Sequence, residues 1–136
     1  MQIRRVSQSL LTFGRSEGGT ATIEAVLWTP IFLILFGLVT DTSIVFGRQA
    51  EILRIVQDSN RSLAVGAFQT VQQAEEYITR KVEVFSDNTV VDVAINDGII
   101  STSVTLPAAD LTSTGLFGGF DSLTITVGAS QMSELG

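Results

Sequence analysis

The sequence contains no cysteine and no histidine among its 136 residues. The absence of cysteine excludes disulfide bonds and thiolate metal sites, and the absence of histidine removes the commonest general base and metal ligand. The sequence shows no phosphate-binding loop, nucleophile elbow or paired acid and base, and its aspartates lack EF-hand spacing. We therefore predict that the protein is not an enzyme, with no catalytic residue, no cofactor and no metal.

Charged residues are also scarce, at 16% of the chain, and they are unevenly distributed. Residues 1–19 carry three arginines and one glutamate, a balance of +2. The rest of the chain carries the other five basic and thirteen acidic residues, a balance of −8. Phosphate contacts need clustered Lys and Arg, so we expect no binding to nucleic acid.

The deficit of charge is concentrated in one segment, because no ionisable side chain occurs from Ala25 to Thr40. After Asp41 the apolar character continues to Gly47. At about 1.5 Å per residue, roughly twenty helical residues cross a hydrocarbon core of about 30 Å. We predict a transmembrane helix at about 25–47, in which Pro30 is tolerated because neighbouring helices can satisfy the carbonyl that it leaves unbonded.

The flanking charges predict the orientation of this helix. Basic residues precede it and acidic residues dominate after it, so the positive-inside rule places the N-terminus in the cytoplasm and the C-terminal part outside. A cleaved secretory signal, a buried core helix and a plain signal anchor are the alternatives. No small-x-small cleavage site follows the apolar run, which argues against the first of them.

A short motif, Gly18-Gly19-Thr20-Ala21-Thr22-Ile23-Glu24, stands directly before the apolar run. An ionised glutamate at membrane depth costs several kcal/mol unless it has a partner. A cut after Gly19 would give Thr20 a free ammonium, with which Glu24 could pair in its own chain or in a neighbouring subunit. The glycines predict an extended backbone that fits a protease active site. The alternative is an incidental glutamate at the edge of an anchor.

At these residues the chain resembles type IV pilins, and specifically the TadE/TadG-like pseudopilins of the tight-adherence (Flp) pilus. The resemblance covers residues 14–61. It implies that a membrane-embedded prepilin peptidase cuts after Gly19, at a site that includes Gly18 and Thr20. Glu24 would be the fifth residue of the processed chain, and Pro30 looks like a helix-packing proline of the TadE pattern.

The resemblance further implies a minor pilin that serves as a structural or assembly component of such a pilus. Its partners would be membrane lipid, the prepilin peptidase, other pilins or pseudopilins and the pilus assembly machinery. Its location would be the bacterial inner membrane, as a single-pass protein, with later incorporation in a pilus left open. The alternative is an unprocessed, single-pass membrane-anchored extracytoplasmic binding module.

Beyond the apolar run the pattern predicts that the helix continues as an amphipathic stem to about residue 63. One face is apolar, and the other alternates in charge through Arg48, Glu51, Arg54, Asp58 and Arg61. The apolar face could pack against partner helices or against the protein's own head. Gly66 is expected to end the stem, and residues 68–85 have the spacing of a second amphipathic helix.

The remaining sequence has the alternation of β-strands. Strands are predicted at 89–95, 99–106 and 122–130, with Asn96-Asp97-Gly98 as a hairpin turn. The loop sequence GLFGGF, at 115–120, is either a partner-binding loop or part of the core. The predicted fold is α+β, with a long N-terminal transmembrane/stem helix, a second amphipathic helix and a small antiparallel β-sheet head. Its parts are a basic cytoplasmic leader (1–19), a TadE-like segment (20–63) and an extracytoplasmic head (64–136).

Overall fold

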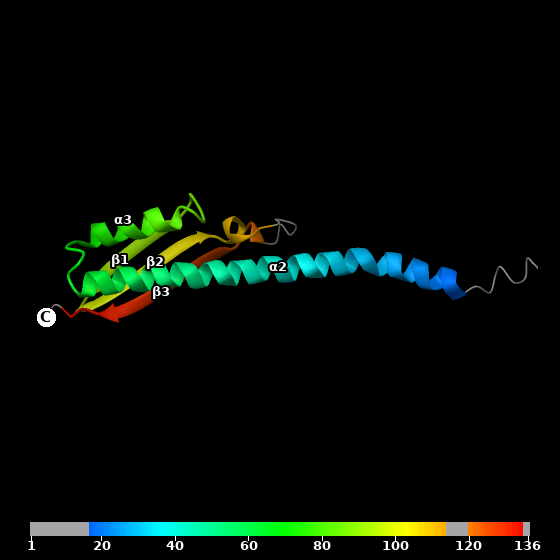
Figure 1. The fold of residues 1–136 in the computed structure, drawn as a ribbon. Helices are drawn as coiled ribbons and strands as arrows, with labels where there is room; N and C mark the ends of the chain where they lie inside the picture. The colour runs from blue at the N-terminus through cyan, green and yellow to red at the C-terminus, as the bar shows by residue number, and fades with distance from the viewer. Residues whose placement is uncertain (1–16, 114–119, 135–136) are drawn as a thin grey trace, which may run out of the picture. The chain divides into compact units, whose positions relative to one another are not determined.

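The computed structural model describes residues 17–113 and 120–134. The chain divides into two compact units, of which the first ends at Gly37 and the second, here called the head unit, runs from Leu38 to Gly136. Figure 1 shows the described elements, which are α2 (Glu17–Ala64), α3 (Val71–Val82), β1 (Val90–Asn96), β2 (Ile99–Pro107), the 3-10 helix η1 (Ala108–Leu111) and β3 (Thr124–Met132). This arrangement confirms the predicted α+β class.

The part of α2 in the first unit is apolar around its whole circumference. Its large hydrophobic side chains from Ile23 to Phe36 are each about half exposed or more, at 49–67%. In a water-soluble helix the apolar residues form one stripe, so a helix that is apolar all round requires a non-aqueous environment or other protein around it. Pro30 lies inside this helix without ending it.

The part of α2 in the head unit is amphipathic, and one face is buried. Val45, Ile52, Val56 and Leu63 are 0–6% exposed, at spacings of seven, four and seven residues. The helix ends at Ala64, and Gly66, which was predicted to end it, follows with a φ of 76°. Gly66 N donates to Leu63 O, and the next amide, of Ala67, donates to Ser62 O, which is the hydrogen-bond pattern of a Schellman cap.

The second predicted helix is α3, which begins with a side-chain cap. Thr70 Oγ1 accepts a hydrogen bond from Gln73 N, and Gln73 Oε1 accepts one from Gln69 N. These bonds satisfy two amides near the helix start that have no intrahelical acceptor. α3 lies against β1, where Glu75 Oε1 accepts a hydrogen bond from Val93 N at 3.3 Å.

The sheet has the order β1-β2-β3, and both pairs are antiparallel. β1 and β2 form the predicted hairpin, with Asn96 opposite Ile99 and a two-residue turn between them. Both turn residues have positive φ, 50° for Asp97 and 76° for Gly98, as a type I′ turn requires. β2 is the central strand, and every second residue from Ile100 to Leu106 is buried.

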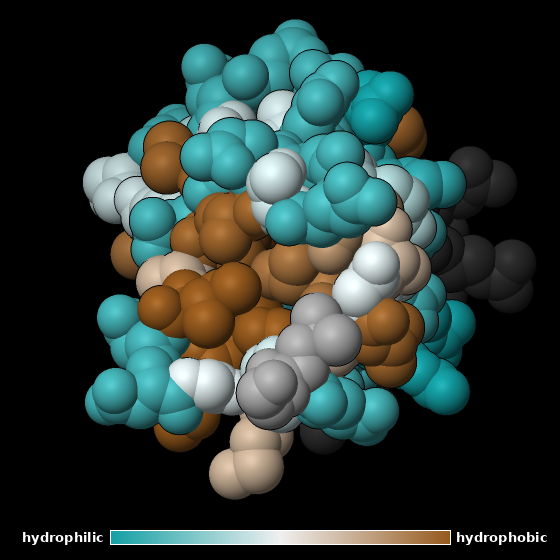
Figure 2. Space-filling model, turned by 90° about the vertical axis from the view of Figure 1, so that its left-hand side faces the viewer, coloured by the Kyte–Doolittle hydropathy of each residue, from teal (hydrophilic) through white to brown (hydrophobic). Residues whose placement is uncertain are grey.

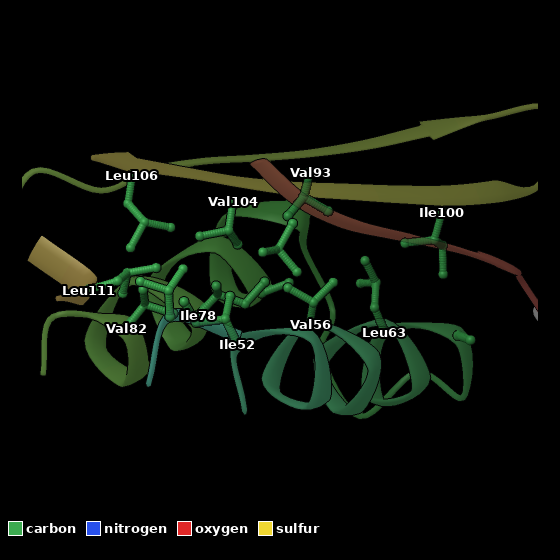
Figure 3. Packing of buried hydrophobic residues seen from close by; sticks show 14 residues of the cluster. Ile52, Val56, Leu63, Ile78, Val82, Val93, Ile100, Val104, Leu106 and Leu111 are labelled. Atoms are coloured by element: carbon green, nitrogen blue, oxygen red, sulfur yellow. The ribbon is translucent and has the colours of Figure 1, made fainter. Parts of the chain in front are cut away.

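The core of the head unit lies between the sheet and the two helices (Figure 3). α2 contributes Ile52 and Val56, and α3 contributes Ile78 and Val82, all of them at 0% exposure. The sheet faces them with buried side chains from all three strands, namely Val93, Ile100, Val104, Leu106 and Val127. The apolar face of the stem therefore packs against the protein's own head, which decides between the two possibilities that the sequence leaves open.

The loop after β2 is only partly described. Leu111, at the end of η1, is fully buried in the core. The Arg48 guanidinium donates to the Asp110 carbonyl at 3.1 Å, and the Ser86 hydroxyl donates to the Asp110 carboxylate at 2.5 Å. Residues 114–119 lie outside the described residues, and with them most of the GLFGGF sequence, so both hypotheses for it stay open.

Hydrophobic side chains are exposed at the end of the head unit where α2 ends. The C-terminal residues tie this end together, because Ser133 N donates to Gly98 O and Glu134 N donates to Ala64 O. Figure 2 looks onto this end and shows hydrophobic side chains surrounded by hydrophilic ones. The exposed residues here are Val65 (53%), Ile95 (47%), Ile99 (43%) and Met132 (74%).

Candidate processing and assembly site

The predicted cleavage site lies in the first turn of α2. Gly18, Gly19 and Thr20 are all helical, which differs from the extended backbone that the glycine pair predicts. The described part of α2 begins at Glu17, so the three residues lie in its first described turn. Each glycine also costs the helix about 1 kcal/mol relative to alanine. The glycine pair therefore lowers the helical stability of this turn.

Glu24 lies one helical turn after Thr20, and its side chain is exposed. Helical side chains tilt toward the N-terminus, so the Glu24 carboxylate is directed toward the turn that holds Thr20. Next to it are Ile23, 64% exposed, and Leu27, 66% exposed. The carboxylate is thus an isolated charge at the start of an apolar surface, and that surface begins within one turn of the glycine pair.

An aromatic ridge continues the row that contains Glu24. Trp28, Phe32 and Phe36 follow at four-residue intervals, with ring centroids 6.2 Å and 6.5 Å apart. The rings contact each other along one side of the helix, and all three are exposed, at 50% for Trp28, 50% for Phe32 and 64% for Phe36. The four-residue spacing of the three aromatics is visible in the sequence, but the ridge was not predicted from it.

Pro30 removes one backbone donor from the middle of this apolar helix. A proline has no N–H, so it cannot donate to the carbonyl of Val26 four residues earlier. The hydroxyl of the preceding residue, Thr29, donates to Ala25 O at 2.7 Å, within its own helix. The Val26 carbonyl is therefore deprived of its regular helical donor at a position where the surrounding side chains are apolar.

The head unit defines where the apolar surface of α2 stops. Asp41 is fully buried, and its Oδ1 accepts a hydrogen bond from Ser113 N at 3.3 Å. Val45 is 6% exposed and belongs to the core. The predicted span of 25–47 thus overlaps the head unit from Asp41 onward, where side chains on one face of α2 contact protein. The predicted span included Asp41, and its burial was not predicted from the sequence.

The comparisons with known proteins agree with this geometry. Within the described residues, α2 is the one helix that is long and apolar enough to cross a membrane. Residues 19–59 match the model of the family described as TadE-like protein. No curated protein and no solved structure matches the chain. The match begins at Gly19 and ends in the stem, so it contains Thr20, Glu24 and Pro30.

A single apolar N-terminal helix that continues into a small α+β head makes the chain a candidate membrane-anchored protein. More particularly, its residues 19–59 are a TadE-like segment, as the sequence motif predicts.

Proposed function

We propose that the protein is a pilin-like structural or assembly component of the tight-adherence (Flp) pilus and that a prepilin peptidase cuts it between Gly19 and Thr20. The observation that carries this proposal is the single carboxylate of Glu24. It stands one turn after the glycine pair and directly before an exposed apolar surface. The TadE-like match, which starts at Gly19, supports the same assignment.

The lipid-facing part of α2 is proposed to run from about Thr20 to Thr40. These 21 residues span about 30 Å, the thickness of a hydrocarbon core. Beyond Thr40, the burial of Asp41 and Val45 in the head unit favours protein contacts over lipid contacts. This span is proposed to cross the bacterial inner membrane, with the N-terminal leader in the cytoplasm and the head unit outside.

In this span Glu24 lies only about 6 Å from the N-terminal end, at a depth where an unpaired charge is costly. Cleavage after Gly19 would create the ammonium of Thr20 one turn away. The pair of opposite charges could form within one chain or between neighbours, and in the second case it would hold two helices in one axial register. The protein is then a substrate of the peptidase and performs no catalysis itself.

Intact-mass measurement of the protein extracted from membranes tests the cleavage. We expect the wild-type chain to lack residues 1–19 and Gly19→Leu to keep them. Gly47→Leu is the matched control, because no atom lies within 4 Å of a Cβ added at either glycine. A wild-type chain of full length would contradict processing and favour the unprocessed, membrane-anchored binding module.

Glu24→Ala and Glu24→Gln test the role of the carboxylate. We expect both variants to insert in the membrane and to be cleaved normally, because the glycine pair is unchanged. Both should be absent or strongly reduced in sheared pilus fractions, because neither can neutralise the Thr20 ammonium. Glu76→Ala, on the exposed side of α3, is the control. Normal incorporation of both Glu24 variants would remove the proposed role.

A further inference from the structure

The outward face of the stem carries a charged stripe, defined here as Glu51, Arg54, Asp58 and Arg61. These residues lie three or four positions apart on one side of α2, and all four are exposed. Their sign alternates along the helix. Although the spacing permits ion pairs within the helix, no ion pair joins these four side chains to one another or to others in residues 17–113 and 120–134.

The stripe is exposed and is therefore available to a neighbouring stem. The opposite face, with Ile52 and Val56, is fully buried against the sheet and α3. A hollow of about 320 Å³ runs beside the stripe between α2 and α3, and Lys81 lines its other side. A side chain from outside can therefore reach Glu51, Arg54 and Asp58 without displacing any core residue.

The alternation of charge limits what can bind along the stripe. A uniformly basic partner would be repelled by Arg54 and Arg61, and a uniformly acidic one by Glu51 and Asp58. A complementary partner must alternate in sign at the same spacing of three to four residues. The stripe itself meets this condition, provided that the two copies are shifted along their axes.

We propose that the charged stripe binds the charged stripe of a second copy of this chain, with the two stems parallel and shifted by about 5 Å. A shift of three to four residues, at about 1.5 Å each, places three of the four charges of each stripe opposite one of the other sign. A shift of zero or of seven residues, about 10.5 Å, places like charges together. The parallel orientation rests on the proposed function, in which the copies share one membrane.

Complementary charge variants test this proposal. An all-acidic stripe is made by Arg54→Glu with Arg61→Glu, and an all-basic stripe by Glu51→Lys with Asp58→Lys. Each full-length variant also carries Gln72→Cys, at an exposed position of α3 in a chain with no other cysteine. Donor- and acceptor-labelled copies are reconstituted together in lipid vesicles, and association is measured by energy transfer.

We expect each variant by itself to associate on the order of tenfold more weakly than the wild-type stripe, because attraction between copies becomes repulsion. A mixture of the all-acidic and all-basic variants should recover wild-type association. Added salt should weaken both the wild type and the mixture, since the stripe is exposed to solvent. Glu76→Lys with Arg80→Glu, an exchange of the exposed ion pair on α3, is the control and should change nothing.

The outcomes separate the stripe from the proposed function. If the wild type associates but either single-sign variant associates equally well, or if the mixture does not recover, the stripe is not the contact. If the wild type itself shows no energy transfer, both the stripe contact and the assembly of copies through this chain are contradicted. Circular dichroism of each variant identifies any that fails to fold, and a variant with one substitution then replaces it in the same comparison.

Discussion

Two residues of α2 show how buried polar groups fix the position of this helix against the rest of the head unit. Asn60 is 1% exposed; its Oδ1 accepts from the Thr102 hydroxyl, and its Nδ2 donates to Ala129 O at 3.1 Å. It therefore bonds to both β2 and β3. Asp41, further toward the N-terminus, bonds to Ser113 N. Each buried polar group is stable only with its partner in place, so together they define the axial position of α2.

Asn60→Ala should destabilise the head unit by about 1–3 kcal/mol, because the buried Thr102 hydroxyl would lose its partner. The measurement is denaturant unfolding of the protein in detergent micelles, followed by circular dichroism. Gln57→Ala is the control, since Gln57 is exposed less than one turn earlier on the same helix. Equal stability of the Asn60 variant and the wild type would show that the two bonds contribute nothing.

At the scale of elements, the local signals in the sequence were sufficient for α3 and for the β1–β2 hairpin. α3 has apolar residues at helical spacing, and three of them, Ala74, Ile78 and Val82, are buried. The hairpin has a turn sequence that suits positive φ between two β-branched runs. The end of the stem at Gly66 is a local signal of the same kind, because only the last turn and its cap are involved.

Two glycine substitutions should change stability in opposite directions. Gly98→Ala should destabilise the head unit by about 1 kcal/mol, because Gly98 has a φ of 76°, where an L-residue with a Cβ is strained. Gly47→Ala should stabilise it by about 0.5–1 kcal/mol, because Gly47 lies inside α2 with open space around its Cα. Thermal unfolding followed by circular dichroism compares the two, and a shift of the same sign in both would contradict this account.

At the scale of the whole molecule, α2 belongs to two environments. Its first part has no buried apolar residue, whereas its last part supplies one side of a core. The change occurs between Thr40 and Val45, where the first buried side chains of α2 appear. A continuous helix can serve both environments because its hydrogen bonds are internal and only its side chains must match what surrounds them.

Single cysteines test the proposed topology, and the absence of native cysteine makes the background clean. The cells are first stripped of any barrier outside the inner membrane, which itself stays intact. A membrane-impermeant maleimide should then label Gln72→Cys in the head unit and should not label Ser7→Cys in the leader. Ser7→Cys is combined with Gly19→Leu, which is expected to keep the leader, and should react after the membrane is opened. Leu33→Cys should stay unlabelled in both conditions, because it lies in the lipid-facing span. Labelling of Ser7→Cys in intact cells would reverse the orientation.

The sequence by itself determined the apolar helix, the motif before it, the second helix, the hairpin and the α+β class. All of these depend on residues that are neighbours along the chain, through spacing, turn chemistry or the lack of charge. Only the tertiary structure decided which surface each face of the stem meets. It showed that the apolar face of α2 covers the protein's own sheet, that Asp41 is buried by a loop about 70 residues away, and that the glycine pair lies in a helix. Contacts between distant segments depend on how the elements pack, and no local pattern in the sequence encodes that packing.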